Sequence, residues 1–334
     1  METSKQQTGA PPRTAIIGAG LAGLAAARAL HDVGADVTVF DKGRGPGGRI
    51  SSRRAEPFAF DHGAQYFTAR TPEFRRQVDD WVADGVVAPW TGRIVSLSAP
   101  QSASGIRPSS GQTERFVGTP RMSSLARHLA DGLDVRTSYR VEALAHTASG
   151  WKLQLNGGGD LGPYGRLIIT APPAQAAALI GDQSPLGAKA AAISMEPCWA
   201  ALLGLSAPYT ASFDGAFCES EILSWVCRNS SKPGRPEREA WVLHATSSWT
   251  SAHMGADRRF VSQALVRELE SLVGEALPQI DHEDLHFWRY ARPALNLEPH
   301  TLSDPDAGLI LAGDAYCGGR VEGAYLSGLA AARA

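Results

Sequence analysis

The sequence predicts an α/β fold in which both ends of the chain build one parallel sheet and the middle of the chain forms a second domain. A short apolar strand at residues 14–17 runs into a glycine-rich turn, and a helix from about Leu21 to Val33 follows. A second strand at 36–40 completes a βαβ unit, which requires a parallel sheet covered by helices. The chain returns to a buried strand at 309–312, so its last residues are expected to join the same sheet.

The composition is that of a folded protein with one large or two smaller cores. The chain has 334 residues, of which 43% are hydrophobic, and its 32 basic and 34 acidic residues give a net charge of -2. This balance lacks the basic footprint of a nucleic-acid-binding or membrane-surface protein. No apolar run approaches the roughly 18 residues of a membrane helix, and residues 1–12 lack a signal peptide's apolar core and are expected to be a disordered tail.

The four cysteines show no metal-like spacing with each other or with histidine. They indicate reduced thiols, no metal site and a cytoplasmic protein. The sequence does not indicate an oligomeric state.

Local signals place the next elements. A hydroxyl residue followed by Pro and Glu at 71–73 predicts a helix start, and Thr119-Pro120 repeats this signal. The apolar faces of these two helices are predicted to be Phe74, Val78, Trp81 and Val82, and Met122, Leu125 and Leu129. A Ser-, Pro- and Gly-rich stretch at 96–113 predicts a loop or an irregular hairpin.

Alternating residues predict antiparallel strands at 135–141 and 151–155, and apolar runs predict further strands at 167–170, 198–205 and 241–246. A helix is expected over 258–277, with Phe260, Leu265, Leu269, Leu272 and Val273 inward. There is no internal repeat. We interpret 13–70, 115–173 and 286–334 as one discontinuous domain, and 71–114 and 174–285 as a mixed α+β domain inserted into it.

The turn after the first strand carries a dinucleotide-binding pattern. Gly18-Ala19-Gly20-Leu21-Ala22-Gly23 follows a strand and opens a helix, which is the context that GxGxxG requires. Its glycines permit the tight turn, the approach of the backbone to a diphosphate and the close packing of helix on strand. Asp41 ends the second strand and is expected to accept hydrogen bonds from the adenosine ribose. The pattern predicts a bound dinucleotide at the helix N-terminus.

Three further motifs identify the dinucleotide. Gly45-Pro46-Gly47-Gly48-Arg49 resembles the second glycine-and-arginine motif of flavin-dependent amine oxidases, in which the Arg helps to hold the FAD diphosphate. Leu311-Ala312-Gly313-Asp314 resembles their FAD-binding glycine-aspartate motif, and Val321-Glu322-Gly323-Ala324 resembles their helix start beside the flavin. The resemblance implies a Rossmann-type FAD-binding domain with an inserted substrate domain. It also implies noncovalent FAD, because Cys317 does not match the covalent flavin cysteine of monoamine oxidases.

The motifs and the resemblance together assign a set of residues to FAD. These are Gly18, Gly20, Leu21, Ala22, Gly23, Asp41, Lys42, Gly48, Arg49, Gly63, Ala64, Gln65, Val141, Gly313, Asp314, Arg320, Val321, Glu322, Gly323 and Ala324.

Several longer segments resemble the renalases, particularly bacterial ones: 61–68, 228–235, 241–246, 288–293 and 319–324. The similarity extends over the chain from Thr14 on. It implies FAD-dependent oxidation of isomeric dihydronicotinamide dinucleotides, the 2-dihydro forms of NAD(P), with the 6-dihydro forms as a further candidate. The products would be NAD(P)+ and, with O2 as the electron acceptor, hydrogen peroxide. The sequence shows no catalytic triad or GxSxG elbow, and hydride transfer to a flavin requires neither.

The renalase resemblance points to Tyr66, Asn229 and His244 as the substrate wall. It points less strongly to Gln65, Trp288, Tyr290 and Arg292. Each candidate has an ordinary structural alternative. His244 could be a hydrogen-bonded core histidine, Tyr66 could pack between the domains, Asn229 could form a turn, and Trp288 and Tyr290 could be core aromatics. The sequence assigns no role to His62 or Cys317.

Two other functions fit the same fold. A flavin amine oxidase or a carotenoid-type desaturase is the first, and amine oxidases often place a lysine near the flavin. Only Lys189 and Lys232 lie in the inserted domain. A non-catalytic FAD-binding redox sensor is the second, and an NAD-dependent dehydrogenase without flavin would leave the C-terminal motifs without purpose. The preferred dihydro isomer and the choice between NAD and NADP stay open.

Overall fold

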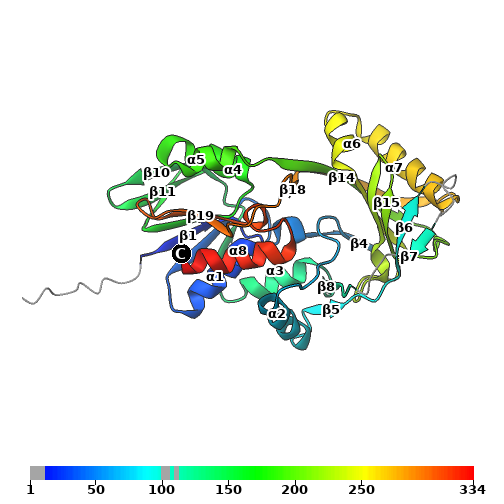
Figure 1. The fold of residues 1–334 in the computed structure, drawn as a ribbon, viewed down its shortest axis with the longest axis horizontal. Coiled ribbons are helices and arrows are strands. Elements are labelled where there is room, and N and C mark those ends of the chain that lie inside the picture. Colours follow the sequence, from blue (N-terminus) through cyan, green and yellow to red (C-terminus); the bar gives the residue numbers. More distant parts are fainter. Residues whose placement is uncertain (1–11, 99–105, 109–112) are drawn as a thin grey trace, which may run out of the picture.

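The computed structural model describes residues 12–98, 106–108 and 113–334. Two halves lie side by side along the long axis of the molecule (Figure 1). One half contains a six-stranded sheet and both described ends of the chain, and the other contains a seven-stranded sheet. The predicted α/β fold with a Rossmann-type domain and a second domain is confirmed. The predicted tail lies largely outside the described residues.

The six-stranded sheet has the order β19-β20-β13-β1-β2-β9. All neighbouring strands in it are parallel except β19, which runs antiparallel to β20. Its strands are β1 (Thr14–Ile17), β2 (Val37–Asp41), β9 (Asp134–Thr137), β13 (Arg166–Ile169), β19 (Thr301–Asp304) and β20 (Leu309–Ala312). Because β1, β2, β13 and β20 are apolar and largely buried, they fit the centre of a sheet covered on both faces.

Helices cover both faces of this sheet. On one face lie α1 (Leu21–Asp32), α3 (Ser123–Ala130) and α8 (Val321–Arg333), and α2 (Pro72–Ala83) packs in the same apolar core. On the other lie α4 (Pro173–Ile180), α5 (Leu186–Ala191) and the antiparallel sheet of β10 (Val141–Thr147), β11 (Gly150–Leu155) and β12 (Asp160–Tyr164). Helices α1 and α8 lie side by side (Figure 1). A Cβ on Gly328 would lie 2.2 Å from the Ala22 carbonyl oxygen, so only glycine permits this close packing.

The seven-stranded sheet has the order β18-β14-β17-β16-β15-β6-β7. Its strands are β6 (Ile94–Ser98), β7 (Ile106–Pro108), β14 (Met195–Leu205), β15 (Gly215–Glu219), β16 (Leu223–Arg228), β17 (Ala240–Ala245) and β18 (Ile280–Pro293). Helix α7 (Arg258–Val273) packs its apolar side on this sheet, and α6 (Ser247–Ala252) lies beside β14. The long strands β14 and β18 continue from this sheet towards the other half (Figure 1).

Two short hairpin-like pairs connect the halves. Strands β3 (Ser52–Ala55) and β4 (Phe58–Asp61) form one, and β5 (Val87–Pro89) and β8 (Phe116–Gly118) form the other. Phe58 and Phe60 of β4 pack against Leu202 and Val242 of the seven-stranded sheet. The β3–β4 pair therefore joins the half with the six-stranded sheet to the half with the seven-stranded sheet.

Most predicted elements are present, with four differences. The antiparallel strand predicted over 135–141 is two strands, β9 and β10, and β9 runs parallel to β2. Thr119-Pro120 does not start a helix, because α3 begins at Ser123 and its N-cap is Met122. The helix predicted over 258–277 ends at Val273, where Gly274 adopts a left-handed conformation. Phe260, predicted to point inward, is 50% exposed in the first turn of that helix. Strands β6 and β7 pair as a hairpin within the stretch predicted as a loop or hairpin, and residues 99–105 and 109–112 lie outside the described residues.

The packing also differs from the predicted domain boundaries. Helix α2 belongs to the apolar core around α1, and α4 and α5 belong to the core under β1 and β13. Although the predicted boundaries place these three helices in the inserted domain, their apolar faces pack on the Rossmann-type sheet and its helices. Within the part of the chain that the structure describes, no helix has the length and apolar character needed to cross a membrane.

Candidate active site

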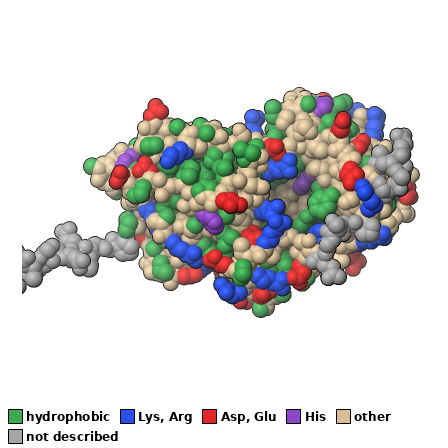
Figure 2. Space-filling model, viewed as in Figure 1, with side chains coloured by type: hydrophobic (Ala, Val, Ile, Leu, Met, Phe, Trp, Pro, Cys, Tyr) green, Lys and Arg blue, Asp and Glu red, His purple; other side chains and the backbone are tan. Residues whose placement is uncertain are grey.

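A cavity of about 2270 Å³ lies between the two halves and is lined by both. A small-molecule site has on the order of 300–1,000 Å³, so this cavity has room for a cofactor and a substrate together. Figure 2 shows a hollow between the two halves, with Lys and Arg side chains at its rim and a His side chain within it.

The N-terminus of α1 lines one end of the cavity and forms the predicted dinucleotide cradle. A Cβ built on Gly20 would meet no heavy atom within 4 Å, so the space over this turn is open to a ligand. Gly48 closes the other side, since its Cβ position lies 3.4 Å from the Gly20 Cα. Gly23 faces the other way, because a Cβ there would lie 1.9 Å from the Gly18 carbonyl oxygen. The turn therefore fits a diphosphate held by backbone N–H groups.

Asp41 lies at the carboxyl end of β2 and lines the cavity. Its two carboxylate oxygens accept hydrogen bonds from the N–H groups of Ala19 and Gly43, at 2.6 Å each. A carboxylate offers about four lone-pair positions, so both oxygens retain acceptor capacity for ribose hydroxyls. The predicted role of Asp41 is compatible with this geometry.

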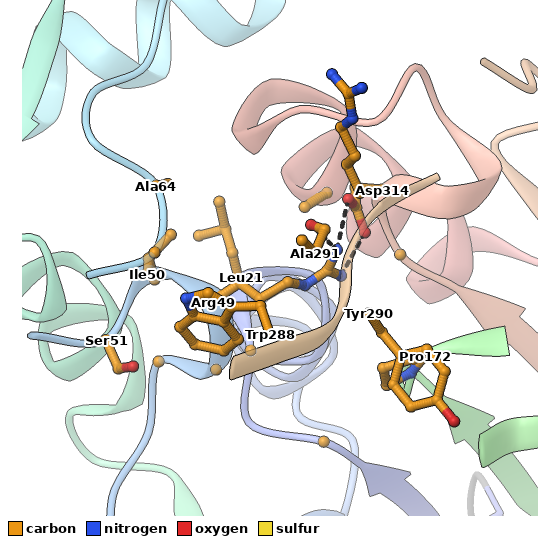
Figure 3. A pocket seen from close by; sticks show the side chains of 18 of the residues that line it. Leu21, Arg49, Ile50, Ser51, Ala64, Pro172, Trp288, Tyr290, Ala291 and Asp314 are labelled. Atoms are coloured by element: carbon orange, nitrogen blue, oxygen red, sulfur yellow. Dashed lines mark hydrogen bonds and ion pairs between the residues drawn. The ribbon is translucent and has the colours of Figure 1, made fainter. Parts of the chain in front are cut away.

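The second and third motifs meet in an ion pair. Nη1 and Nη2 of Arg49 lie 2.9 and 2.5 Å from Oδ2 and Oδ1 of Asp314, and Nη1 also donates to the Ala291 carbonyl oxygen at 3.3 Å. Figure 3 shows the Arg49 guanidinium held between Asp314 and Ala291. The two residues assigned to FAD from opposite ends of the chain thus lie together on the cavity wall.

The N-terminus of α8 also reaches the cavity, through Val321, Glu322 and Ala324. The Glu322 side chain accepts hydrogen bonds from the N–H groups of Arg70 and Thr71 and from the Thr71 hydroxyl. These contacts fix α8 to the start of α2. A Cβ on Gly323 would lie 1.6 Å from the Cys317 carbonyl oxygen, so Gly323 allows this helix to begin against the preceding turn.

The cavity is lined by most of the residues assigned to FAD. These are Gly18, Gly20, Leu21, Ala22, Asp41, Lys42, Gly48, Arg49, Gly63, Ala64, Val141, Gly313, Asp314, Arg320, Val321, Glu322 and Ala324. Gly23, Gln65 and Gly323 lie behind its surface. Cys317 is also absent from the lining, and its Sγ faces His300 Nδ1 at 3.6 Å.

Five predicted substrate-site residues line the cavity: Tyr66, His244, Trp288, Tyr290 and Arg292. One backbone group positions two of them, since the His62 carbonyl oxygen accepts from Trp288 Nε1 at 2.9 Å and lies 3.1 Å from His244 Nε2. The His62 ring also stacks on Trp288, with ring centroids 5.1 Å apart. Tyr66 packs against Trp225, as the packing alternative required, and still lines the cavity.

Asn229 does not form part of the cavity wall, which corrects its predicted place there. Its side chain is buried, and Nδ2 donates to the Ala59 carbonyl oxygen at 2.8 Å. Oδ1 accepts from Lys232 Nζ at 2.9 Å. Gln65 is also buried, and its Oε1 accepts from Lys232 Nζ at 3.1 Å. Both side-chain amides form hydrogen bonds with buried groups, and they therefore lie behind the cavity wall and not on it.

The sequence does not predict a buried cluster of three charged side chains behind the cavity wall, beside Asn229 and Gln65. The Asp61 carboxylate lies 2.6 Å from Arg235 Nη2 and 3.4 Å from Lys232 Nζ, and all three side chains are at most 1% exposed. Burial alone would raise the pKa of Asp61, but the charges of Lys232 and Arg235 outweigh it and lower the pKa to about 2. One carboxylate therefore faces two cations. The one sequence signal for this cluster is that Asp61 and the two cations all lie in renalase-like segments, 61–68 and 228–235.

Three histidines beside the cavity are held neutral. Burial is the main cause and lowers the pKa of His244 to about 4 and that of His62 to about 3. His286, whose ring lies 4.8 Å from that of His62, has its pKa lowered to about 4 by burial and by Arg53. At neutral pH these rings are uncharged, so they suit the stacking and orientation of a planar ligand better than proton donation.

Comparison with known proteins supports the same fold and cofactor. Residues 16–81 match the NAD(P)-binding Rossmann-like domain, and residues 109–334 match the flavin-containing amine oxidoreductases. A zeta-carotene-forming phytoene desaturase from Myxococcus xanthus is 47% identical over 51 residues, which are 15% of this chain and 10% of the desaturase. The matched segment thus spans about a tenth of that relative.

Two solved structures have the same fold over nearly the whole chain. A protein from Exiguobacterium sp. 255-15 assigned as a protoporphyrinogen oxidase has a TM-score of 0.75 and 13% identity, covering 97% of this chain and 99% of that one. Cyclohexylamine oxidase from Brevibacterium oxydans IH-35A has a TM-score of 0.75 and 13% identity, covering 96% and 98%. At this identity the likeness concerns the fold alone.

The fold and the cavity define a flavin-dependent oxidoreductase with a two-domain architecture. The chain belongs to the flavin-containing amine oxidoreductase family, and its cofactor is FAD.

Proposed function

We propose that this protein is a renalase-like oxidase of isomeric dihydronicotinamide dinucleotides, with 2-dihydro-NAD(P) as the main substrate and the 6-dihydro forms as further candidates. FAD supplies the hydride acceptor, and O2 is the final electron acceptor, which gives NAD(P)+ and hydrogen peroxide. The proposal rests on the renalase-like segments and on one observation of the cavity, its charge.

The cavity is strongly cationic. Eleven arginines and one lysine line it, against five acidic residues, of which Asp314 and Glu196 are already paired with Arg49 and Arg292. The FAD diphosphate would neutralise only part of this excess. A focused positive potential attracts an anionic substrate and repels a protonated amine. A dinucleotide, which carries a diphosphate of its own, fits this charge.

The residues around His62 supply what the substrate ring would need. The rings of Trp288, Tyr290 and Tyr66 line the cavity, and so does the neutral ring of His244. The His62 carbonyl fixes the orientation of Trp288 and His244, so the wall is preorganised. The oxidation of a dihydropyridine restores aromaticity, and these residues need only hold the ring in place and exclude water.

An amine oxidase or a desaturase is the second candidate, favoured by the family match and by the fold of cyclohexylamine oxidase. Its expected lysine is the point of difference. Lys232 is enclosed by Asp61, Gln65 and Asn229 and does not line the cavity. Lys189 lies exposed on α5, which packs on the Rossmann-type sheet.

Anaerobic stopped-flow mixing tests the proposal. The FAD-loaded protein is mixed with 2-dihydro-NAD, with ordinary NADH and with amines such as cyclohexylamine and putrescine, and flavin bleaching is followed. We expect fast bleaching by 2-dihydro-NAD alone and hydrogen peroxide on admitting air. Bleaching by an amine alone would assign the protein to the amine oxidases, and bleaching by no donor would favour the redox sensor.

Variants of Trp288 connect the activity to the wall. Trp288→Phe retains a ring but loses the hydrogen bond to the His62 carbonyl, and Trp288→Leu removes the ring. We expect slower bleaching by 2-dihydro-NAD in both, with the larger loss in Trp288→Leu. Equal rates in all three proteins would show that Trp288 does not contact the substrate.

A further inference from the structure

Three arginines line the cavity at the junction of the β3–β4 pair with α3. Arg54 lies on β3, Arg121 lies just before α3, and Arg127 lies on α3 itself. Arg54 and Arg127 are exposed and Arg121 is partly exposed. Their guanidinium groups are therefore accessible from the cavity.

The three arginines of this cluster have no ion-pair partner among the described residues. Among the described residues, none of the three side chains forms an ion pair or a hydrogen bond, whereas Arg49, Arg53 and Arg292 on the same cavity each pair with a carboxylate. Burial lowers the pKa of Arg121, and the positive charges of Arg127 and Arg54 lower it further. The charges of Asp61 and Glu56 oppose this effect more weakly. The three cations thus lie close enough to repel one another.

The backbone around the cluster is held by other groups. The Met122 N–H donates to Asp61 Oδ1 at 3.1 Å, and the Ser123 N–H donates to Ser52 Oγ at 3.2 Å. Ser52 Oγ in turn donates to Asp61 Oδ1 at 2.7 Å. The Asp61 carboxylate and the Ser52 hydroxyl therefore fix the start of α3 against β3, and each accepts one N–H group there. An anion at this place would be bound by the guanidinium groups.

Unpaired arginines that converge on a cavity suit phosphate, because each guanidinium donates several hydrogen bonds in a planar fork and keeps its charge. We propose that Arg54, Arg121 and Arg127 bind the phosphate groups of the substrate dinucleotide, the diphosphate or a 2′-phosphate. This inference rests on the proposed function for the identity of the ligand. It assigns the anionic part of the substrate to the β3–α3 junction.

The cluster is separate from the groups that would hold the FAD diphosphate. Those groups are the α1 N-terminus at Gly20, together with Arg49 beside Asp314. Arg49 lies in the short turn at Gly48–Ile50, whereas Arg54 lies further along the chain on strand β3. Arg121 lies just before α3 and Arg127 lies on it, and neither belongs to a flavin motif.

Binding of a non-reactive probe tests the inference. ADP-ribose and its 2′-phosphorylated form carry the phosphates without the reacting ring, and their affinity for the FAD-loaded protein is measured by calorimetry at two salt concentrations. We expect the double variant Arg121→Gln/Arg127→Gln to bind ADP-ribose roughly ten- to a hundredfold more weakly, with a smaller salt dependence. Arg54→Gln, a single change on an exposed strand position, is expected to weaken binding in the same direction.

Arg259→Gln is the matched control, because Arg259 is exposed on α7 and does not line the cavity. It should bind ADP-ribose as the unchanged protein does. Unchanged ADP-ribose affinity in the double variant and in Arg54→Gln would overturn the inference. Loss of FAD from these variants, with ADP-ribose affinity retained, would also overturn it and assign the cluster to the cofactor.

The two proposals can fail separately. Arginine-dependent ADP-ribose binding without flavin bleaching by 2-dihydro-NAD would leave the phosphate site standing and remove the proposed activity. Bleaching by 2-dihydro-NAD, together with ADP-ribose binding that does not depend on these arginines, would leave the proposed activity standing and remove the phosphate site.

Discussion

Arg49 and Asp314 are 265 positions apart in the chain and form a bidentate ion pair on the cavity wall, with N–O distances of 2.5 and 2.9 Å. Arg49 belongs to the loop after β2, and Asp314 follows β20. The ion pair therefore connects the N-terminal and C-terminal parts of the chain within the FAD-binding half. The Arg49 side chain remains 30% exposed, so it can contact a cofactor while Asp314 holds it.

Replacing Arg49 by Lys should weaken FAD binding. Lysine retains the charge but cannot make two parallel hydrogen bonds to Asp314, so its ammonium would not be held at the cofactor. We expect about ten- to a hundredfold weaker FAD binding, in line with hydrogen bonds to charged groups of about 1.5–3 kcal/mol. The measurement is a titration of apoprotein with FAD, followed by quenching of flavin fluorescence.

Asp314→Asn is the companion variant for this prediction. It removes the partner and leaves Arg49 free, so FAD binding should again weaken. Wild-type FAD affinity in both variants would show that the pair is structural and does not position the cofactor.

Gly20→Ala and Gly23→Ala should fail in different ways. A Cβ on Gly20 meets no protein atom within 4 Å, so this variant should keep its thermal stability but bind FAD roughly tenfold or more weakly. A Cβ on Gly23 would lie 1.9 Å from a backbone oxygen, so this variant should lose about 1–3 kcal/mol of unfolding free energy. Thermal unfolding of the two apoproteins, together with FAD titration, separates these effects. A stable Gly23→Ala apoprotein would contradict the assigned packing role.

The Rossmann-type domain could be predicted because its signals are local. The turn at Gly18–Gly23 with its flanking strand and helix specifies a βαβ unit within 30 residues, and the later motifs each occupy a few positions. The helix predicted after Thr119-Pro120 is present with its predicted apolar face, but its predicted start was wrong, because a cap signal in sequence does not show which backbone N–H groups find other acceptors. Here the Met122 N–H donates a hydrogen bond to Asp61, which is distant in sequence.

The layer behind the substrate wall could not be predicted, because its contacts are long-range. Asp61 meets Lys232 and Arg235 across more than 170 positions, and no periodicity indicates such a contact. The same layer withdraws Asn229 from the cavity, since its amide has buried partners there. Trp288 and His244 reached the cavity as expected, but the carbonyl of His62 that orients both carried no sequence signal.

Replacing Asp61 by Asn should destabilise the protein strongly. The change leaves Lys232 and Arg235 as two buried cations without a counter-charge. Breaking a buried ion pair in this way costs about 3–5 kcal/mol of unfolding free energy. Chemical denaturation measures the loss.

The double variant Asp61→Asn/Lys232→Met serves as the control for Asp61→Asn. It removes one of the two cations and should recover part of the lost stability, which a double-mutant cycle quantifies. No recovery would show that the loss does not arise from the uncompensated charge.

Acid should affect the same carboxyl only at low pH. The pKa of Asp61 is lowered from its ordinary 3.8 to about 2, so its contribution to stability is complete above about pH 4 and is lost as the pH falls through 2. In the Asp61→Asn variant this part of the acid dependence should be absent. An equal acid dependence in both proteins would contradict the lowered pKa of Asp61.

The three neutral histidines predict a different pH dependence, between pH 7 and 5. Their folded-state pKa values of about 3 to 4 lie below the ordinary 6.5, so the unfolded chain binds more protons in this range and the folded state loses stability as the pH falls below 6.5. Each histidine contributes at most about 1.4 kcal/mol per pH unit, and His286 contributes less because it is only partly buried.

Urea denaturation at pH 5, 6 and 7 should show this decline in stability, and His244→Gln should make the decline shallower by removing one titrating group. A His244→Gln slope equal to that of the unchanged protein would mean that folding does not lower the pKa of His244.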